Sequence, residues 1–360
     1  MDFVYKFPVV KGLQAKKEYY IAMVPLGMIE KMFPDEEYVL PEYRAQRKLN
    51  EARIPVISRY ILENRSSYVF SALAASIDGD FTFISSSDNA DIGVLEISMA
   101  SRVLINDGQH RKAAILEALQ EDEALATETI PIVFFEDKGL VHSQQIFTDL
   151  NKNAVKTSNS IAELYDSRDE LAVVTRNVIR NIPFLDAYTD KEKDNLGKYS
   201  SKLFTLNTFY VSNKLILGRR IDETTEQFLV QFWSCIVENM EQWQELEKKQ
   251  ITKIDLRENY IATQAIVIQA IGRIGQYFYE NGVRDMDKIM ERLKQIDWQR
   301  SSKQWYLRAI RANGRIITSK QAAILIGNVI KNKLEIPLSV QEKSIEQKHI
   351  ENTMYSIGEQ

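Results

Sequence analysis

The feature that most constrains the fold of this chain is a short segment in which a strand pattern changes, across one glycine, into a helix pattern. Residues 102–106 form a strand-like run, the pentapeptide DGQHR follows at 107–111, and a helical pattern begins near Lys112. Such a turn places the free N–H groups of the first helical turn at the end of a sheet, where their partial positive charge favours an anion. The pentapeptide, called the signature from this point on, therefore predicts an α/β unit with a phosphate site.

Individual residues of the signature fit that prediction in different ways. Gly108 lets the backbone approach an anion, and Arg111 supplies a bidentate donor for phosphate oxygens. Asp107, or Asn106 before it, can cap the helix; Asp107 can instead hold Arg111 or His110, or coordinate magnesium beside nucleotide phosphates. His110 fits either a structural hydrogen bond or a part in catalysis. The same residues also fit an ordinary strand, turn and helix with one arginine, so both interpretations stay open.

Residues 104–115 resemble the ParB/sulfiredoxin superfamily, in which a turn of the form Gly-Glu-Arg-Arg or Gly-Cys-His-Arg binds nucleotide phosphates. Gln109 stands where sulfiredoxin has its nucleophilic cysteine, and an amide forms no thiolate, so sulfiredoxin chemistry is excluded. The resemblance also implies a second polar element near the phosphates, after the next strand and helix. The predicted nucleotide site comprises Gly108, Gln109, Arg111, Asn151, Asn153 and Lys156, with Asp107 and His110 as catalytic candidates.

The pentapeptide is itself the signature of the DGQHR-domain proteins, and within that group residues 1–165 resemble the DndB family of DNA phosphorothioation (sulfur modification) regulators. The resemblance is carried by Glu18–Tyr20, Arg44–Arg47, Leu49–Asn50, Arg53–Pro55, Arg59–Leu62, Tyr68–Leu73 and Ala75–Asp78. It implies a transcriptional repressor that binds double-stranded promoter DNA of a bacterial phosphorothioation gene cluster and senses phosphorothioated DNA. The alternative is a nucleotide-binding NTPase of a DNA modification or defence system, working with magnesium; because the chain has no Walker A lysine motif, a P-loop mechanism is excluded. A third hypothesis is a scaffold for the modification enzymes.

The net charge of −4 conceals a basic segment. Residues 298–334 contain no Asp or Glu but eight Lys and Arg, which leaves the remainder of the chain at about −12. This segment favours contact with a polyanion, or it is a solvated surface whose charges pair with acidic residues elsewhere. A second group of basic residues lies near residue 50, where nearby glutamates are able to neutralise its charge. The predicted DNA contacts are Arg44, Arg47, Arg53, Arg300, Lys303, Arg308, Arg311, Arg315 and Lys320.

Length and composition indicate two domains. With 360 residues, 44% of them hydrophobic, we expect an α/β ParB-like domain over 1–165 and a mainly α-helical domain over 166–360. No apolar run has the length of a membrane span and no signal peptide is recognisable, so we expect a cytoplasmic protein that forms homo-oligomers or binds modification-system proteins but no membrane. The single cysteine, Cys235, predicts a buried structural thiol, and the spacing of the three histidines predicts no metal site.

The patterns also predict individual elements. Strands are expected at 4–12, 19–23, 81–84, 93–99, 102–105 and 130–136, and helices at 42–50, 55–63, 112–119, 141–150, 203–217, 224–248, 260–280, 286–296, 305–312 and 319–333. The pair at 305–312 and 319–333 fits either a helix-turn-helix or two helices that close a bundle. Asn159 or Ser160 is expected to begin a helix, with Glu163 completing a capping box. The polar segment after Pro337 is expected to fray or to bind a partner.

Overall fold

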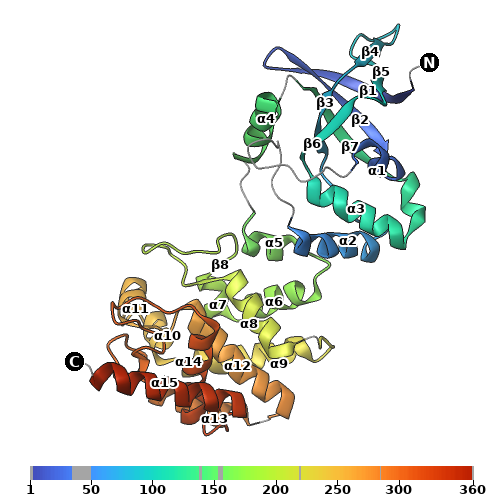
Figure 1. Ribbon diagram of the computed structural model, residues 1–360. Coiled ribbons are helices and arrows are strands. Elements are labelled where there is room, and N and C mark those ends of the chain that lie inside the picture. The colour runs from blue at the N-terminus through green and yellow to red at the C-terminus, as the bar shows by residue number, and fades with distance from the viewer. Residues whose placement is uncertain are drawn as a thin grey trace. The chain divides into compact units, whose positions relative to one another are not determined.

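The computed structural model describes residues 3–34, 50–137, 140–152, 157–218, 220–283 and 285–358 (Figure 1). Contacts divide the chain into two compact units, Met1–Val155 and Lys156–Gln360. The sequence places this boundary after residue 165, but α5 (Asn159–Tyr165) packs on α6 and α8 of the second unit. The predicted classes, α/β for the first unit and mainly helical for the second, are confirmed.

Seven strands of the described residues form one mixed sheet in the first unit, in the order β4-β5-β1-β2-β7-β3-β6. They are β1 (Val4–Gln14), β2 (Lys17–Pro25), β3 (Leu73–Asp78), β4 (Phe81–Ser85), β5 (Ile92–Ser98), β6 (Arg102–Asp107) and β7 (Thr129–Glu136). Neighbouring strands are antiparallel except β3 and β7, which run parallel. All the predicted strands are present, and alternate residues such as Phe7 and Val9 on β1 point into the core.

Strand β3 was not predicted, although it lies between β7 and β6. Residues 73–77, Leu-Ala-Ala-Ser-Ile, are all buried. A strand that is covered on both faces shows no alternation of polar and apolar residues, and two alanines give it little β-propensity. The alternation of polar and apolar residues that predicts the other strands is therefore absent from β3.

Short helices cover the sheet of the first unit. They are η1 (Leu26–Met28), α1 (Ile29–Met32), η3 (Glu51–Arg53), α2 (Ile54–Glu63), α3 (Gln109–Glu121), η4 (Glu123–Thr127) and α4 (Leu140–Lys152). Helix α2 packs on α3, and α4 packs on β6. Pro55 lies in the first turn of α2, as predicted, because its missing N–H is not needed there. The helix predicted at 42–50 lies outside the described residues apart from Asn50, which is not helical.

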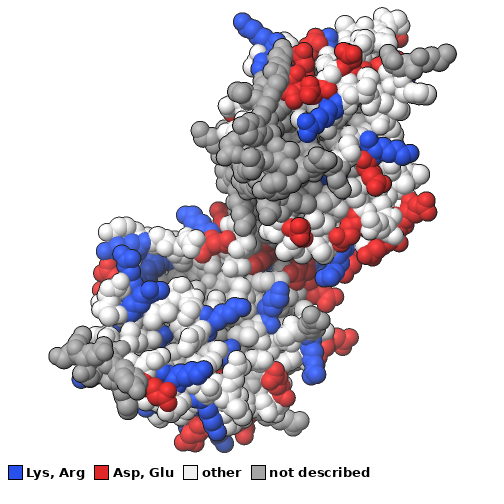
Figure 2. Space-filling view, in the orientation of Figure 1, with Lys and Arg blue, Asp and Glu red and all other residues white. Residues whose placement is uncertain are grey.

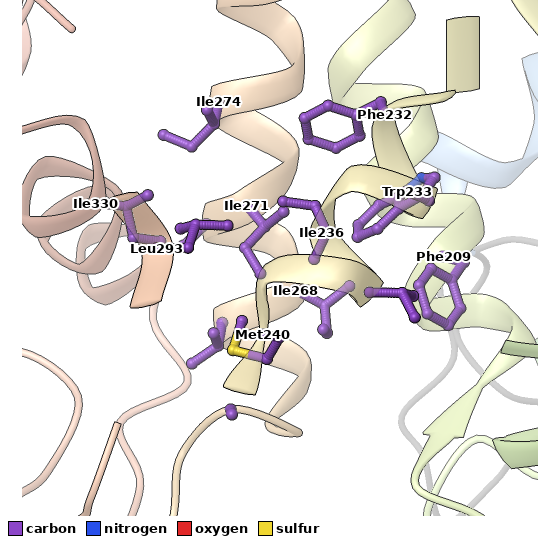
Figure 3. Close-up of a cluster of buried hydrophobic side chains, with 14 of the residues drawn as sticks. Phe209, Phe232, Trp233, Ile236, Met240, Ile268, Ile271, Ile274, Leu293 and Ile330 are labelled. Atoms are coloured by element: carbon purple, nitrogen blue, oxygen red, sulfur yellow. The ribbon is translucent and has the colours of Figure 1, made fainter. Parts of the chain in front are cut away.

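The second unit is a helical body with one two-stranded ribbon. Its elements are α5, α6 (Glu170–Asn181), α7 (Pro183–Tyr188), β8 (Thr189–Asp190), β9 (Phe204–Thr205), α8 (Leu206–Leu217), α9 (Thr225–Asn239), α10 (Glu241–Glu247), α11 (Lys253–Asn259), α12 (Ala265–Asn281), α13 (Met286–Met290), η5 (Glu291–Gln295), η6 (Lys303–Trp305), α14 (Lys320–Lys333) and α15 (Val340–Gly358). Helix α12 packs closely on α8 and α14. Figure 3 shows its Ile268, Ile271 and Ile274 among side chains of α8, α9, α14 and η5. Cys235 is buried among them, as predicted.

The helix predicted at 305–312 is absent, so the helix-turn-helix considered for this pair is wrong. Residues 306–318 form turns instead of a helix, closed by backbone hydrogen bonds such as Leu307 N to Ile310 O at 2.7 Å and Ile317 N to Ala309 O at 2.8 Å. Helix α14 is present where expected but buries most of its surface against α12, α15 and η5. A recognition helix must present a free face to a groove, so α14 cannot serve as one.

Candidate functional site

The signature forms the predicted strand, turn and helix, but the helix begins earlier than expected. Helix α3 starts at Gln109, and Gly108 is its N-cap residue with φ +104°. A Cβ at this position would overlap Leu73 Cδ2 of β3, so both the backbone angle and the packing require glycine. Neither Asp107 nor Asn106 caps the helix. The first amides of α3 therefore have no side-chain cap among the described residues, which is the arrangement that anions favour.

Arg111 is held within the protein. Its Nη2 donates to Asp107 Oδ2 at 2.6 Å, and its Nη1 donates to Ala72 O at 2.9 Å, to Ser71 O at 2.7 Å and to the Ser71 hydroxyl. The Arg111 side chain is only 17% exposed. Of the roles considered for Asp107, holding Arg111 is the one that the structure contains. Arg111 thus ties the segment before β3 to the signature, a structural function that the sequence analysis left open.

The other polar groups of the signature have different surroundings. His110 Nε2 accepts a hydrogen bond from the backbone N of Asn50 at 3.0 Å, so this nitrogen carries no proton in that contact. Asn106 is buried and accepts from Ser76 Oγ at 2.7 Å. Gln109 Nε2 is buried and has no hydrogen-bond partner among the described residues. The Gln109 amide is therefore a donor that the protein itself does not satisfy.

The predicted second polar element lies largely outside the described residues. Asn153 and Lys156 are not described, and Asn151 lies in α4 with a side chain that is not described. Helix α4 itself packs on β6, the strand that leads into the signature. That the polar residues at its end reach the signature stays a prediction.

A pocket of about 440 Å³ lies beside the segment that Arg111 holds, and the sequence analysis missed it. Its wall includes Arg65, whose Nε lies 2.8 Å from Asp122 and whose Nη1 lies 2.6 Å from Glu128. The Tyr68 hydroxyl also donates to Glu128, and these hydrogen bonds hold the pKa of Glu128 below its usual value. Burial, with the bond to Glu128, raises the pKa of Tyr68 to about 12. In the sequence, only the family resemblance of residues 68–73 marked this region. These residues contain no motif that predicts a pocket.

The basic segment divides into paired and exposed cations. Arg308 pairs with Glu346, with Nη1 2.8 Å from Oε2, and the buried Lys331 pairs with Glu342 at 2.8 Å. Arg300 is partly buried, and burial lowers its pKa. The exposed members are Lys303, Arg311, Arg315, Lys320 and Lys333. Pairing with distant acids therefore accounts for two of the eight charges, and in the described part of the chain no ion pair joins the exposed five to a carboxylate.

Two of the exposed cations lie at one tight turn. Gly314 N donates to Arg311 O and Arg311 N donates to Arg315 O, each at 2.8 Å, and Gly314 has φ +77°. Residues 303–320, called the basic loop, thus carry four exposed cations, including Lys303 and Lys320. Figure 2 shows Lys and Arg interspersed with Asp and Glu on the face that it presents.

The second basic concentration is only partly described. Arg53 is exposed in η3, and Arg59 is exposed on α2. Arg44 and Arg47 lie outside the described residues.

Over the described ranges, no group of three or more His, Cys, Asp or Glu is placed to hold a metal ion. In the same ranges, no helix has the length and apolar character needed to cross a membrane.

The fold and site define a two-unit protein with an α/β unit carrying a glycine-turn signature and a helical unit carrying an exposed basic loop. A family model described as DndB, DNA-sulfur modification-associated, matches residues 7–337. The chain therefore belongs to the DndB family. No curated protein and no solved structure matches it.

Proposed function

We propose that this chain is a DNA-binding transcriptional regulator, a repressor that binds the promoter of a bacterial DNA phosphorothioation gene cluster. Membership of a DNA-sulfur modification-associated family supports the biological setting. The observation that carries DNA binding is the basic loop, in which Lys303, Arg311, Arg315 and Lys320 are exposed. Four cations on one acid-free loop suit a phosphate backbone, where each contact releases bound counterions.

The direct test is titration of a labelled promoter duplex and a scrambled duplex of the same length with the full chain. A repressor binds both through phosphate contacts and prefers the promoter through contacts with base edges or DNA shape. We expect stronger binding to the promoter duplex, and repression of a reporter placed behind that promoter. Equal affinity for both duplexes, with no repression, would leave a nonspecific DNA-binding protein and refute the regulator.

We further propose that phosphorothioated DNA is a ligand. Replacing a phosphate oxygen by sulfur keeps the charge but makes the acceptor larger and softer, so discrimination requires an apolar or weakly hydrated contact. Competition between plain and phosphorothioated duplexes of one sequence, repeated over a salt series, tests this. Equal competition at every salt concentration would contradict sensing of the modification.

The second candidate function is nucleotide binding and hydrolysis at a ParB-like site. Two observations favour it: the uncapped amides at the start of α3 and the unsatisfied Nε2 of Gln109. A nucleotide phosphate would bind these amides, while Asp107 or His110 would position magnesium or water. Because Arg111 is committed to the protein, Gln109→Ala is the sharper variant.

Calorimetry with ATP, GTP and CTP, each with magnesium, decides this second function. We expect one nucleotide to bind the parent, and Gln109→Ala to weaken that binding. Gln145→Ala, which removes an exposed amide from α4, is the matched control and should bind as the parent does. Absence of binding by the parent for all three nucleotides would refute the phosphate site.

A further inference from the structure

Helix α15 is attached to the second unit largely through charged side chains. Glu342 receives hydrogen bonds from Lys331 Nζ at 2.8 and 2.9 Å, and Arg273 Nη2 lies 3.6 Å from the same carboxylate. One turn further along, Glu346 pairs with both terminal nitrogens of Arg308. Three cations therefore meet two carboxylates of α15 among the described side chains.

Over residues 340–352 of α15, whose side chains the structure describes, no apolar side chain is fully buried. Val340 is 87% exposed, Ile350 is 37% exposed and Ile345 is half-buried, whereas Glu342 is 3% exposed. Further contacts are polar, since Asn328 Nδ2 donates to Glu346 Oε2 at 3.0 Å and to the backbone oxygen of Glu342 at 3.1 Å. A carboxylate that neutralises a cation can be replaced by another anion at the same cation, because the buried cation needs an anionic partner but not a particular one. Another polyanion is therefore able to compete with α15.

The three cations belong to the body of the second unit and remain when α15 is displaced. Arg273 is on α12 and Lys331 on α14, two helices packed together in the core. Arg308 lies in the basic loop, where Ala309 N bonds Trp305 O at 2.9 Å and Trp305 is fully buried. Without α15, the buried Lys331 and the partly buried Arg273 and Arg308 require other anions as partners.

The covered cations are also continuous in sequence with the exposed ones. Arg308 lies between Lys303 and Arg311 of the basic loop, both exposed. In addition, the residues that match the DndB family end at 337, before α15 begins at Val340. The helix thus covers one end of the proposed DNA-binding surface with a segment outside the matched part of the chain.

We propose that α15 is a displaceable strap that masks a second phosphate-binding surface, formed by Arg273, Arg308 and Lys331, and that duplex DNA displaces it. The carboxylates of Glu342 and Glu346 take the places of backbone phosphates while DNA is absent. DNA binds this surface only when the strap is open. The apparent dissociation constant of this surface is therefore the intrinsic one divided by the fraction of molecules in which the strap is open. This inference rests on the proposed DNA-binding function and deepens it.

Hydrogen exchange of the full-length protein tests the strap without any mutation. Peptides covering residues 340–352 are followed with and without a plain 20-base-pair duplex at low salt. The strap predicts faster exchange in these peptides when the duplex is bound, while peptides from α12 keep their protection. Unchanged or slower exchange over 340–352 in the DNA complex would overturn it.

A matched pair of variants tests the same point by affinity. Glu346→Gln removes the partner of Arg308, and Glu351→Gln removes the same charge from an exposed position on the same helix. Loss of one partly buried ion pair raises the open fraction, so we expect Glu346→Gln to bind the duplex about tenfold more tightly than Glu351→Gln. Equal affinity of the two variants would refute the strap. If the parent binds no duplex at low salt, DNA binding itself fails; if it binds while α15 stays protected, only the strap fails.

Discussion

Arg111 of the first unit and Arg311 of the second carry the same guanidinium group in opposite surroundings. Arg111 is surrounded by oxygen atoms of its own chain, from Asp107, Ser71 and Ala72. Arg311 stands at an exposed turn, four residues from the equally exposed Arg315. The first therefore stabilises the fold, and the second is available for a phosphate.

The difference teaches that a basic residue in a plausible motif is not by itself a binding residue. A guanidinium has five N–H donors, and what decides its role is how many of them the protein already uses. While α15 is in place, Arg308 and Lys331 use donors within the protein as Arg111 does, whereas Lys303, Arg311, Arg315 and Lys320 remain open.

The largest effect is expected from Arg111→Ala. Removal of the guanidinium leaves the carbonyls of Ser71 and Ala72 and the carboxylate of Asp107 without their donor, at a cost of about 3 to 5 kcal/mol in the stability of the first unit. Calorimetric unfolding measures this loss. Arg59→Ala, at an exposed position on α2, is the control and should change stability by less than about 0.5 kcal/mol. If Arg111→Ala is as stable as the parent, the two arginines do not differ as claimed.

Gly108→Ala is expected to have the next largest effect, because it combines an unfavourable φ of +104° with overlap on Leu73. We expect a loss of about 2 to 4 kcal/mol. Gly282→Ala isolates the backbone contribution, since Gly282 has φ +59° but nothing within 4 Å of an added Cβ. That control should cost about 1 kcal/mol. Equal costs for the two variants would show that packing against Leu73 does not matter.

A smaller effect on stability is expected from Glu163 of the second unit, whose carboxylate has a hydrogen-bond partner for only one of its two oxygens among the described residues. Helix α5 begins at Asn159, as predicted, but Ser158 caps it, and Glu163 buries its carboxyl group instead of completing a capping box with Ser160. One oxygen accepts from Asn207 Nδ2 at 2.6 Å, and the other has no partner among the described residues. Burial, together with the nearby acids, raises the pKa of Glu163 from 4.5 to about 7.

The sign of the resulting pH dependence follows from proton binding. The folded state holds a proton on Glu163 at pH values between 4.5 and about 7, where the unfolded state does not, so this stabilisation falls as the pH rises through that window. We expect the parent to lose about 2 kcal/mol relative to Glu163→Gln between pH 5 and 8. All four tryptophans lie in the second unit, so their fluorescence during urea unfolding measures the stability of this unit at each pH. Parallel pH profiles for parent and variant would contradict the raised pKa.

Local patterns predicted the parts of the fold that local chemistry determines. The glycine at position 108, the apolar run before it and the helical pattern after it were enough to predict β6 and α3. Strand β3 was missed because it is buried on both faces, and the helix at 305–312 was wrong because hydrogen bonds such as Ile317 N to Ala309 O replace helical ones. In both cases tertiary contacts outweighed propensity.

The roles of the candidate site residues could be predicted only as alternatives. The partners of Arg111 at Ser71 and Ala72 lie about forty residues away in sequence, and Glu346 lies 38 residues from Arg308. Nothing in the spacing of a motif reveals such contacts. The acid-free segment correctly indicated where cations concentrate, but only the three-dimensional structure separates the paired cations from the exposed ones.

The central claim is that the exposed cations of the basic loop contact DNA. It is tested most directly by the salt dependence of duplex affinity for Arg311→Ala/Arg315→Ala, with Lys248→Ala/Lys288→Ala as a control that removes two exposed cations elsewhere in the second unit. We expect the double arginine variant to lose about 1 to 2 kcal/mol of binding and to reduce the log–log salt slope by about 2, with the control unchanged. Identical slopes and affinities for the two double variants would contradict the claim.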